Sequence, residues 1–256
     1  MNTIAYKFVD GEKRETSFSH RKTVWSALNV FFTYLHRRKI IDENPMDYIE
    51  RANKKDDVKR PYLQANDLKK ILKAIEEGGD SDNEDLRKWL IPRNKAIFLL
   101  FITTGMRRGA LSQIDVDDID FGKKQLQIID KGNVHFTYDL DDTVIEAIEE
   151  WLIRRKERLR SSKLTNALFI NGLGDRLNSA NIRIMINTYS QKALGYKISP
   201  HKLRAAYCTL YYEATHDIFK VQQAVKHASV LTTQKYIVSN QNYQQEASNT
   251  ILKMMR

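Results

Sequence analysis

Apolar residues recur at helical spacing between residues 20 and 38, while the basic residues of this stretch lie off that stripe. The spacing predicts an amphipathic helix over residues 20–38, as part of a small helical unit. The apolar positions are Val24, Leu28, Phe31, Phe32 and Leu35.

The periodicity is lost over residues 40–63, which are charged and contain Pro45 and Pro61. Such a composition is typical of a turn, a short helix and an exposed linker. We therefore predict a small N-terminal unit over residues 1–58 and a main domain over residues 59–256.

Helical alternation returns at Gln64, and we expect Asn66 to cap the start of this helix. Its apolar face consists of Leu68, Ile71, Leu72 and Ile75. A second helix is predicted to reach Gly105 and to be broken or begun at Pro92, because proline lacks a backbone N–H.

A β signal follows. The stretches "DIDF", "QLQIID" and "HFTYDL" are separated by turns at Gly122 and at residues 131–133, which predicts an antiparallel meander. Helical patterns return at residues 143–159, 179–194, 201–214 and 242–255. The predicted fold class is mostly α with a small antiparallel β-sheet (α+β).

The charge balance favours a polyanionic partner. The chain has 42 Lys and Arg against 32 Asp and Glu, a formal net charge of +10. Ribosomal proteins, membrane-surface proteins and nucleases share this property. The longest apolar run, residues 96–102, is shorter than the roughly 18 residues of a bilayer span. Because no signal peptide opens the sequence and Cys208 is a single cysteine, we expect a cytoplasmic protein.

Residues 115–121, "DVDDIDF", lack the glycine and terminal glutamate of a calcium loop, and the six histidines lack zinc-ligand spacing. The sequence contains no GxxxxGK[ST] loop. We expect no metal and no cofactor, and we interpret the acidic run as a solvated strand edge.

Phosphodiester cleavage without metal needs a nucleophile, cations around the phosphate and an acid for the leaving alkoxide. Arg107 in "TTGMRRG", His201 and Arg204 in "HKLR", and Lys131 in "DKGN" supply suitable groups. Taken singly, none of them identifies a site, because surface arginines, helix starts and turn lysines are commonly just solvated.

Their order and spacing are more specific. Arg107 and Lys131 are 24 residues apart, His201 and Arg204 three, Arg204 and His227 23, and His227 and Tyr236 nine. With "KHASVLTTQKYI", this set resembles the tyrosine recombinases of the phage integrase family over roughly residues 60–240.

The resemblance implies a role for each residue. Tyr236 would attack a DNA phosphate, and His227 would donate a hydrogen bond to it. Arg107 and Arg204 would hold the non-bridging oxygens. His201 would accept the tyrosine proton or steady the phosphate, and Lys131 would protonate the leaving 5′-oxygen.

The match departs from the family pattern in two places. Ala110 stands where an acidic residue is frequent, and Lys226 stands where a glycine usually precedes the histidine. Residues 1–58 resemble only part of the family's helical core-binding (SAM-like) unit. A truncated chain, a late start codon and a degenerate element all fit this shortfall.

Double-stranded DNA is the predicted partner, with a site-specific recombinase of a phage or mobile element as the leading hypothesis. A DNA-binding remnant and a type IB topoisomerase-like strand transferase are the alternatives. The stripe Tyr243, Ala247, Ile251 and Met255 would dock into a neighbouring protomer of a tetramer on DNA, or pack in cis. Backbone contacts are predicted from Arg21, Lys22, Lys54, Lys55, Lys59, Arg60 and Lys226.

Overall fold

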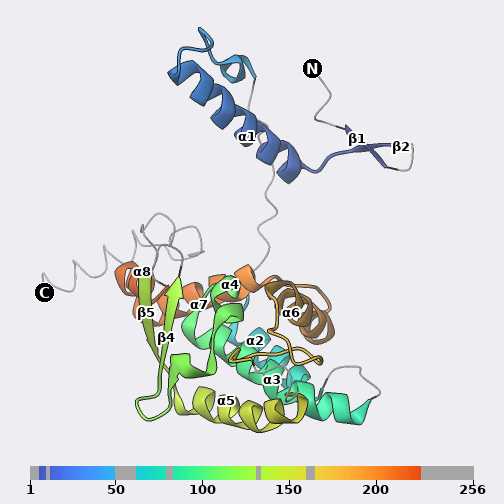
Figure 1. Cartoon of the computed structure of the whole chain (residues 1–256), viewed down its shortest axis with the longest axis vertical. Coiled ribbons are helices and arrows are strands. Elements are labelled where there is room, and N and C mark those ends of the chain that lie inside the picture. The colour runs from blue at the N-terminus through green and yellow to red at the C-terminus, as the bar shows by residue number, and fades with distance from the viewer. Residues whose placement is uncertain are drawn as a thin grey trace, which may run out of the picture. The chain divides into compact units, whose positions relative to one another are not determined.

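The computed structural model describes residues 6–9, 12–49, 62–78, 83–130, 134–159 and 165–225 (Figure 1). The chain divides into two compact units, Met1–Arg60 and Pro61–Arg256, and each is described by itself. The predicted boundary lay between residues 58 and 59. The identity of the first unit as a partial core-binding unit stays a prediction.

The first unit pairs strands β1 (Tyr6–Val9) and β2 (Glu12–Glu15) in an antiparallel hairpin that precedes helix α1 (Phe18–Arg37). We predicted the helix but not the hairpin, whose strands are only four residues each. The short helix η1 (Pro45–Tyr48) folds back on α1, where the side-chain amide of Asn44 donates to the side-chain oxygen of Asn29 at 3.1 Å.

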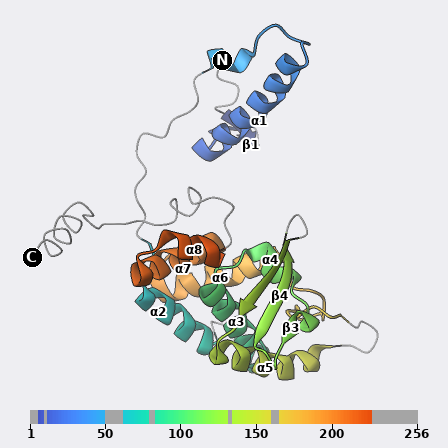
Figure 2. The ribbon, with the colours of Figure 1, turned by 90° about the vertical axis from the view of Figure 1, so that its left-hand side faces the viewer.

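The second unit is built around α3, whose residues 96–101 are all buried. A helix that is apolar all round is expected at the centre of a domain. α3 packs against α2, α5 and α7. In Figures 1 and 2, α5 lies along one edge of this unit and α7 and α8 along the opposite edge. The helices are α2 (Ala65–Glu76), α3 (Glu84–Thr104), α4 (Arg108–Gln113), α5 (Asp142–Arg155), α6 (Ser179–Leu194), α7 (Pro200–Thr215) and α8 (Ile218–Val225), with short turns η2 (Val116–Asp118) and η3 (Lys156–Arg158).

Two predicted helix boundaries were wrong. α2 is capped by Gln64 rather than Asn66, because the Asp67 carboxylate accepts from the Gln64 backbone N–H at 3.0 Å and closes a capping box. α3 passes through Pro92 without a break. Proline costs about 3 kcal/mol in a helix interior, and the long buried face of α3 offsets that cost.

The predicted meander is confirmed as a three-stranded antiparallel sheet in the order β3 (Ile119–Asp120), β4 (Gln125–Asp130), β5 (Val134–Asp139). Leu126 pairs with Tyr138 and Ile128 with Phe136. Leu126 and Ile128 are both buried, as the two-residue alternation of a strand requires when one face packs on the core.

Residues 165–177 carry two isolated antiparallel bridges, Asp115↔Ala167 and Ile170↔Arg176, which the sequence did not predict. The first joins this segment to the chain that follows α4, and the second pairs two residues within the segment. The Trp151 indole N–H donates to the Leu168 carbonyl at 2.8 Å and fixes the segment on α5.

Helices α6 and α7 begin and end within one residue of their predicted limits. The predicted tail helix, residues 242–255, lies outside the described residues. None of the described helices is long and apolar enough to cross a membrane.

Candidate active site

Arg107 is placed by a sharp turn at the end of α3. Gly105 adopts a left-handed conformation (φ 59°), and its N–H donates to the Phe101 carbonyl at 3.0 Å. Met106 is 1% exposed and anchors the turn in the core. Arg107 then occupies the position before α4 with extended backbone, and its side chain is exposed. The chain thus passes from core to surface within three residues.

Arg204 lies on α7, next to the turn at Gly105, and is 3% exposed. Its Nη1 donates to the Gly105 carbonyl at 2.5 Å, and its Nη2 donates to the Val225 carbonyl at 2.7 Å. One buried guanidinium therefore joins the turn that carries Arg107, helix α7 and the end of α8.

His201 lies in the first turn of α7, one helical turn before Arg204. Pro200 at the first helical position starts the helix there. Unlike Arg204, His201 is exposed. The helix therefore presents one predicted site residue to solvent and buries the other.

The remaining predicted catalytic residues, Lys131, His227 and Tyr236, lie outside the described residues, and their roles stay predictions. The described chain leads toward two of them. The pair Asp130↔Val134 brackets the turn of Lys131, and α8 ends at Val225, two residues before His227. Through the Val225 carbonyl, Arg204 thus holds the chain next to the histidine motif.

The predicted DNA contacts are also incompletely described. Arg21 and Lys22 lie near the start of α1, where Lys22 is exposed and Arg21 is partly buried. The other five, Lys54, Lys55, Lys59, Arg60 and Lys226, lie outside the described residues.

The sequence profile described as "Phage integrase family" matches residues 61–243, most of the chain. This match includes all the predicted catalytic residues, namely Arg107, Lys131, His201, Arg204, His227 and Tyr236. The chain belongs to the phage integrase family of tyrosine recombinases.

Curated relatives in this family are tyrosine recombinases XerC. The protein from Pelotomaculum thermopropionicum is 29% identical over 239 residues, which cover 91% of this chain and 73% of the relative. The protein from Caldanaerobacter subterraneus subsp. tengcongensis is 32% identical over 248 residues, which cover 94% of this chain and 65% of the relative. The chain thus spans about two thirds to three quarters of these relatives' lengths.

Among solved structures, a XerH site-specific recombinase bound to palindromic difH substrate, in a post-cleavage complex, has a similar fold. Its TM-score is 0.71 at 25% identity, with 93% of this chain and 68% of the XerH chain covered. The similarity agrees with the mostly helical fold and the small antiparallel sheet described above.

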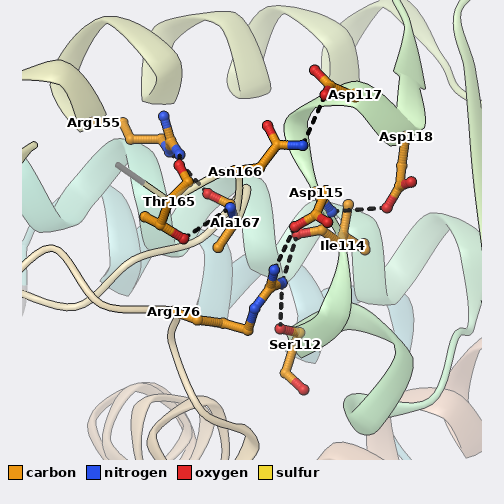
Figure 3. Close-up of polar contacts among 10 residues, drawn as sticks. All are labelled: Ser112, Ile114, Asp115, Asp117, Asp118, Arg155, Thr165, Asn166, Ala167 and Arg176. Atoms are coloured by element: carbon orange, nitrogen blue, oxygen red, sulfur yellow. Dashed lines mark hydrogen bonds and ion pairs between the residues drawn. The ribbon is translucent and has the colours of Figure 1, made fainter. Parts of the chain in front are cut away.

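The acidic run, predicted to be a solvated strand edge, does include the edge strand β3, but three of its carboxylates also make specific contacts. Asp118 Oδ2 accepts from the Asp115 backbone N–H at 2.8 Å, and Asp117 Oδ2 accepts from the Asn166 amide at 2.8 Å. Asp115 pairs with Arg176 (Figure 3). These carboxylates cap a turn and join distant segments.

Within the described residues, no group of three or more His, Cys, Asp and Glu side chains could hold a metal ion.

Two ionisable side chains near Arg204 have raised pKa values. Burial raises the pKa of the Tyr207 hydroxyl to about 12, with the nearby Tyr211 adding to the effect. Burial also raises the pKa of the Cys208 thiol to about 11. Both groups are therefore protonated near neutral pH.

Sequence reasoning missed the groups that hold the site together. The Gly105 and Val225 carbonyls carry no side-chain signal, so their contacts with Arg204 cannot be read from residue types. Tyr207 packs its ring over Gly105, and helical spacing from Arg204 places it on the same side of α7. Arg176 lies in a segment without periodicity, and no pattern marked it.

Proposed function

We propose that this chain is a site-specific recombinase that cleaves and rejoins double-stranded DNA through a 3′-phosphotyrosine intermediate, without metal or ATP. The observation that carries the proposal is the buried Arg204, whose two hydrogen bonds join the Arg107 turn to the chain leading into the histidine motif. Membership of the phage integrase family supports the same reading.

In the proposed reaction, the Tyr236 hydroxyl loses its proton, with His201 accepting it or steadying the phosphate, and attacks the scissile phosphorus. The bond between phosphorus and the 5′-oxygen breaks, and Lys131 donates a proton to that oxygen. Arg107, Arg204 and His227 stabilise the charge on the non-bridging oxygens in the transition state.

The phosphotyrosine keeps the DNA phosphate in ester linkage, so a 5′-hydroxyl from another strand reverses the step. That hydroxyl loses a proton as it attacks, and Tyr236 regains one as it leaves. The cycle is balanced and consumes no nucleotide cofactor. An ordinary tyrosine has a pKa of about 10, so the cations around the phosphate contribute to activating Tyr236.

For the partner, we propose DNA bound by both units, with backbone contacts from Arg21, Lys22, the basic residues of the 51–61 linker and Lys226. The XerH structure is a complex with its difH substrate, which supports this partner. We also propose that the tail residues Tyr243, Ala247, Ile251 and Met255 assemble a tetramer on DNA. We also propose a cytoplasmic location, because that is where the protein would meet its DNA substrate.

The test uses nicked duplexes from the flanks of the chain's own genetic element, without metal, and a denaturing gel to detect a covalent protein–DNA adduct. Wild type should form the adduct, and Tyr236→Phe, which lacks only the nucleophilic oxygen, should not. DNA binding without any adduct would contradict the proposal and favour a binding remnant. Relaxation of supercoiled plasmid of any sequence would favour a topoisomerase instead.

A further inference from the structure

The chain from Gly105 to Asp115 carries Arg107 and is held at both ends by arginines from later in the sequence. At its start, Arg204 donates to the Gly105 carbonyl. At its end, Arg176 Nη1 lies 3.3 Å from the Ser112 carbonyl oxygen and 3.2 Å from that of Ile114 (Figure 3). The reaction proposed above accounts for Arg204 but assigns nothing to Arg176.

The helix between these anchors is too short to hold its own shape. α4 has six residues, and helices of this length gain little stability from their own hydrogen bonds. The last carbonyls of a helix have no partner within it. Arg176 supplies donors where α4 ends, so it fixes the end opposite Arg107.

The Arg176 guanidinium is itself fixed by charge. Its Nη2 pairs with the Asp115 carboxylate. A guanidinium presents its N–H groups in a planar fork, so one side chain contacts the carboxylate and the two carbonyls together. A lysine ammonium could keep the ion pair but not this planar arrangement.

The segment that pairs with the end of α4, residues 165–168, is also held in place. Arg155 donates from Nε to the Ala167 carbonyl at 2.9 Å and from Nη2 to the Thr165 carbonyl at 2.6 Å. The Leu168 N–H donates to the Ile114 carbonyl at 2.9 Å, which completes the bridge between the two segments. Figure 3 shows Arg155 and Arg176 on either side of this bridge. The end of α4 is therefore tied to a segment that is itself tied to α5.

We infer that Arg176 is a positioning residue for Arg107: by holding the C-terminal end of α4, it fixes where the Arg107 guanidinium meets the scissile phosphate. The inference rests on the proposed function, in which Arg107 contacts a non-bridging oxygen. The Arg176 side chain is 32% exposed, so it lies at the edge of the core rather than within it.

The test compares Arg176→Gln and Arg176→Lys with wild type in single-turnover adduct formation on the nicked duplex. We expect Arg176→Gln to slow adduct formation by about 10- to 100-fold, since a misplacement of about 1 Å costs up to that order. The rate of adduct formation by Arg176→Lys should lie between the rates of Arg176→Gln and wild type. The DNA affinity of both variants should change less than about twofold, because Arg176 contacts protein carbonyls. The control is Arg154→Gln, which removes an exposed arginine paired with Glu157 and should keep the wild-type rate.

A second substrate separates positioning from general damage. In it, a methyl group replaces one non-bridging oxygen of the scissile phosphate, so the reacting group has less negative charge for Arg107 to stabilise. The diastereomer used is the one on which Arg107→Ala comes closest to the wild-type rate. If Arg176 acts through Arg107, the rate of adduct formation by Arg176→Gln should also come closer to the wild-type rate on this substrate, as that of Arg107→Ala does.

An equal deficit on both substrates would overturn the inference, because a merely structural defect slows every substrate. A wild-type rate for Arg176→Gln on the natural phosphate would overturn it as well, while leaving the proposed function intact. Failure of wild type itself to form an adduct would reject the proposed function and the inference with it. If Arg176→Gln does not fold, Arg176→Lys provides the same comparison, since it keeps the ion pair with Asp115.

Discussion

Arg204 and Gly105 are 99 residues apart in the sequence and are joined by a hydrogen bond of 2.5 Å between Nη1 and the Gly105 carbonyl oxygen. The same guanidinium donates to the Val225 carbonyl. Both acceptors are backbone atoms of the protein itself. The guanidinium is therefore held in place by the fold, as preorganised electrostatic catalysis requires.

Arg204→Lys should damage both stability and chemistry. A lysine cannot reach two carbonyls in the fork geometry, so at least one buried acceptor loses its partner, at a cost of about 1–3 kcal/mol. Adduct formation should fall by about 100-fold or more, in line with the loss of one oxyanion-stabilising donor. The measurements are urea unfolding and single-turnover adduct formation.

The matched control for this variant is Lys220→Gln, which alters an exposed cation 4.0 Å from Asp217. It should leave both quantities unchanged. A wild-type cleavage rate in Arg204→Lys would show that the fork geometry of Arg204 is dispensable.

Gly105→Ala should destabilise the protein by about 2–4 kcal/mol, because two effects add. The backbone at Gly105 is left-handed (φ 59°), and an added Cβ would lie 2.5 Å from Cδ1 of Tyr207. The comparison is Gly109→Ala, where a Cβ meets nothing within 4 Å and alanine favours the helix. Thermal or urea unfolding of the two variants checks this, and equal stabilities would contradict it.

The periodic elements of the fold were predictable from the sequence because their signals are local. α6, α7 and the meander follow from apolar spacing and turn residues. Two local rules gave wrong helix boundaries. The break predicted at Pro92 is absent because the packing of α3 outweighs the cost of proline. The cap predicted at Asn66 is absent because Gln64 and Asp67 form a capping box instead. The bridges at Ala167 and Ile170 depend on contacts between distant segments, which no local pattern reports.

The site divides in the same way. Arg107, His201 and Arg204 were proposed by resemblance, because their motifs are short and their spacing is specific, and their catalytic roles stay predictions. Arg176 was not proposed, because its partners are the carbonyls of Ser112 and Ile114, and backbone atoms are the same for every residue type. The hydrogen bonds from Arg204 to the carbonyls of Gly105 and Val225 could not be predicted for the same reason.

The stability of the protein should fall in alkaline solution partly through Cys208. Burial raises the pKa of this thiol from 9.0 to about 11 in the folded protein. The folded state thus binds the proton more tightly, so this contribution is complete below pH 9 and is lost as the pH rises toward 11. Between pH 8 and pH 10.5 the loss should be about 1–2 kcal/mol.

The measurement is the free energy of unfolding of wild type and Cys208→Ala at both pH values. The cavity left by alanine costs the same at each pH and cancels. The difference between the two proteins should therefore shrink at pH 10.5. A difference that stays constant with pH would show that the thiol titrates alike in both states.

Asp115→Asn should destabilise the protein by about 1–2 kcal/mol, because the Arg176 guanidinium loses its charged partner and the nearby Arg155 loses a favourable charge. The estimate is modest because the Asp115 side chain is 36% exposed, so water and salt screen the pair. Asp117→Asn is the matched control two residues away. The Asp117 side chain accepts one hydrogen bond from the Asn166 amide at the surface, so this change should cost less than about 0.5 kcal/mol.

Urea unfolding at low and high salt distinguishes the ionic part of the Asp115 effect from its hydrogen-bonding part. The deficit of Asp115→Asn relative to wild type should decrease as salt rises, because screening weakens the ion pair that wild type retains. The deficit of Asp117→Asn should remain small throughout. If the two variants lose equal stability, the ion pair between Asp115 and Arg176 contributes no more than a surface contact, and Arg176 is held by its two carbonyl partners instead.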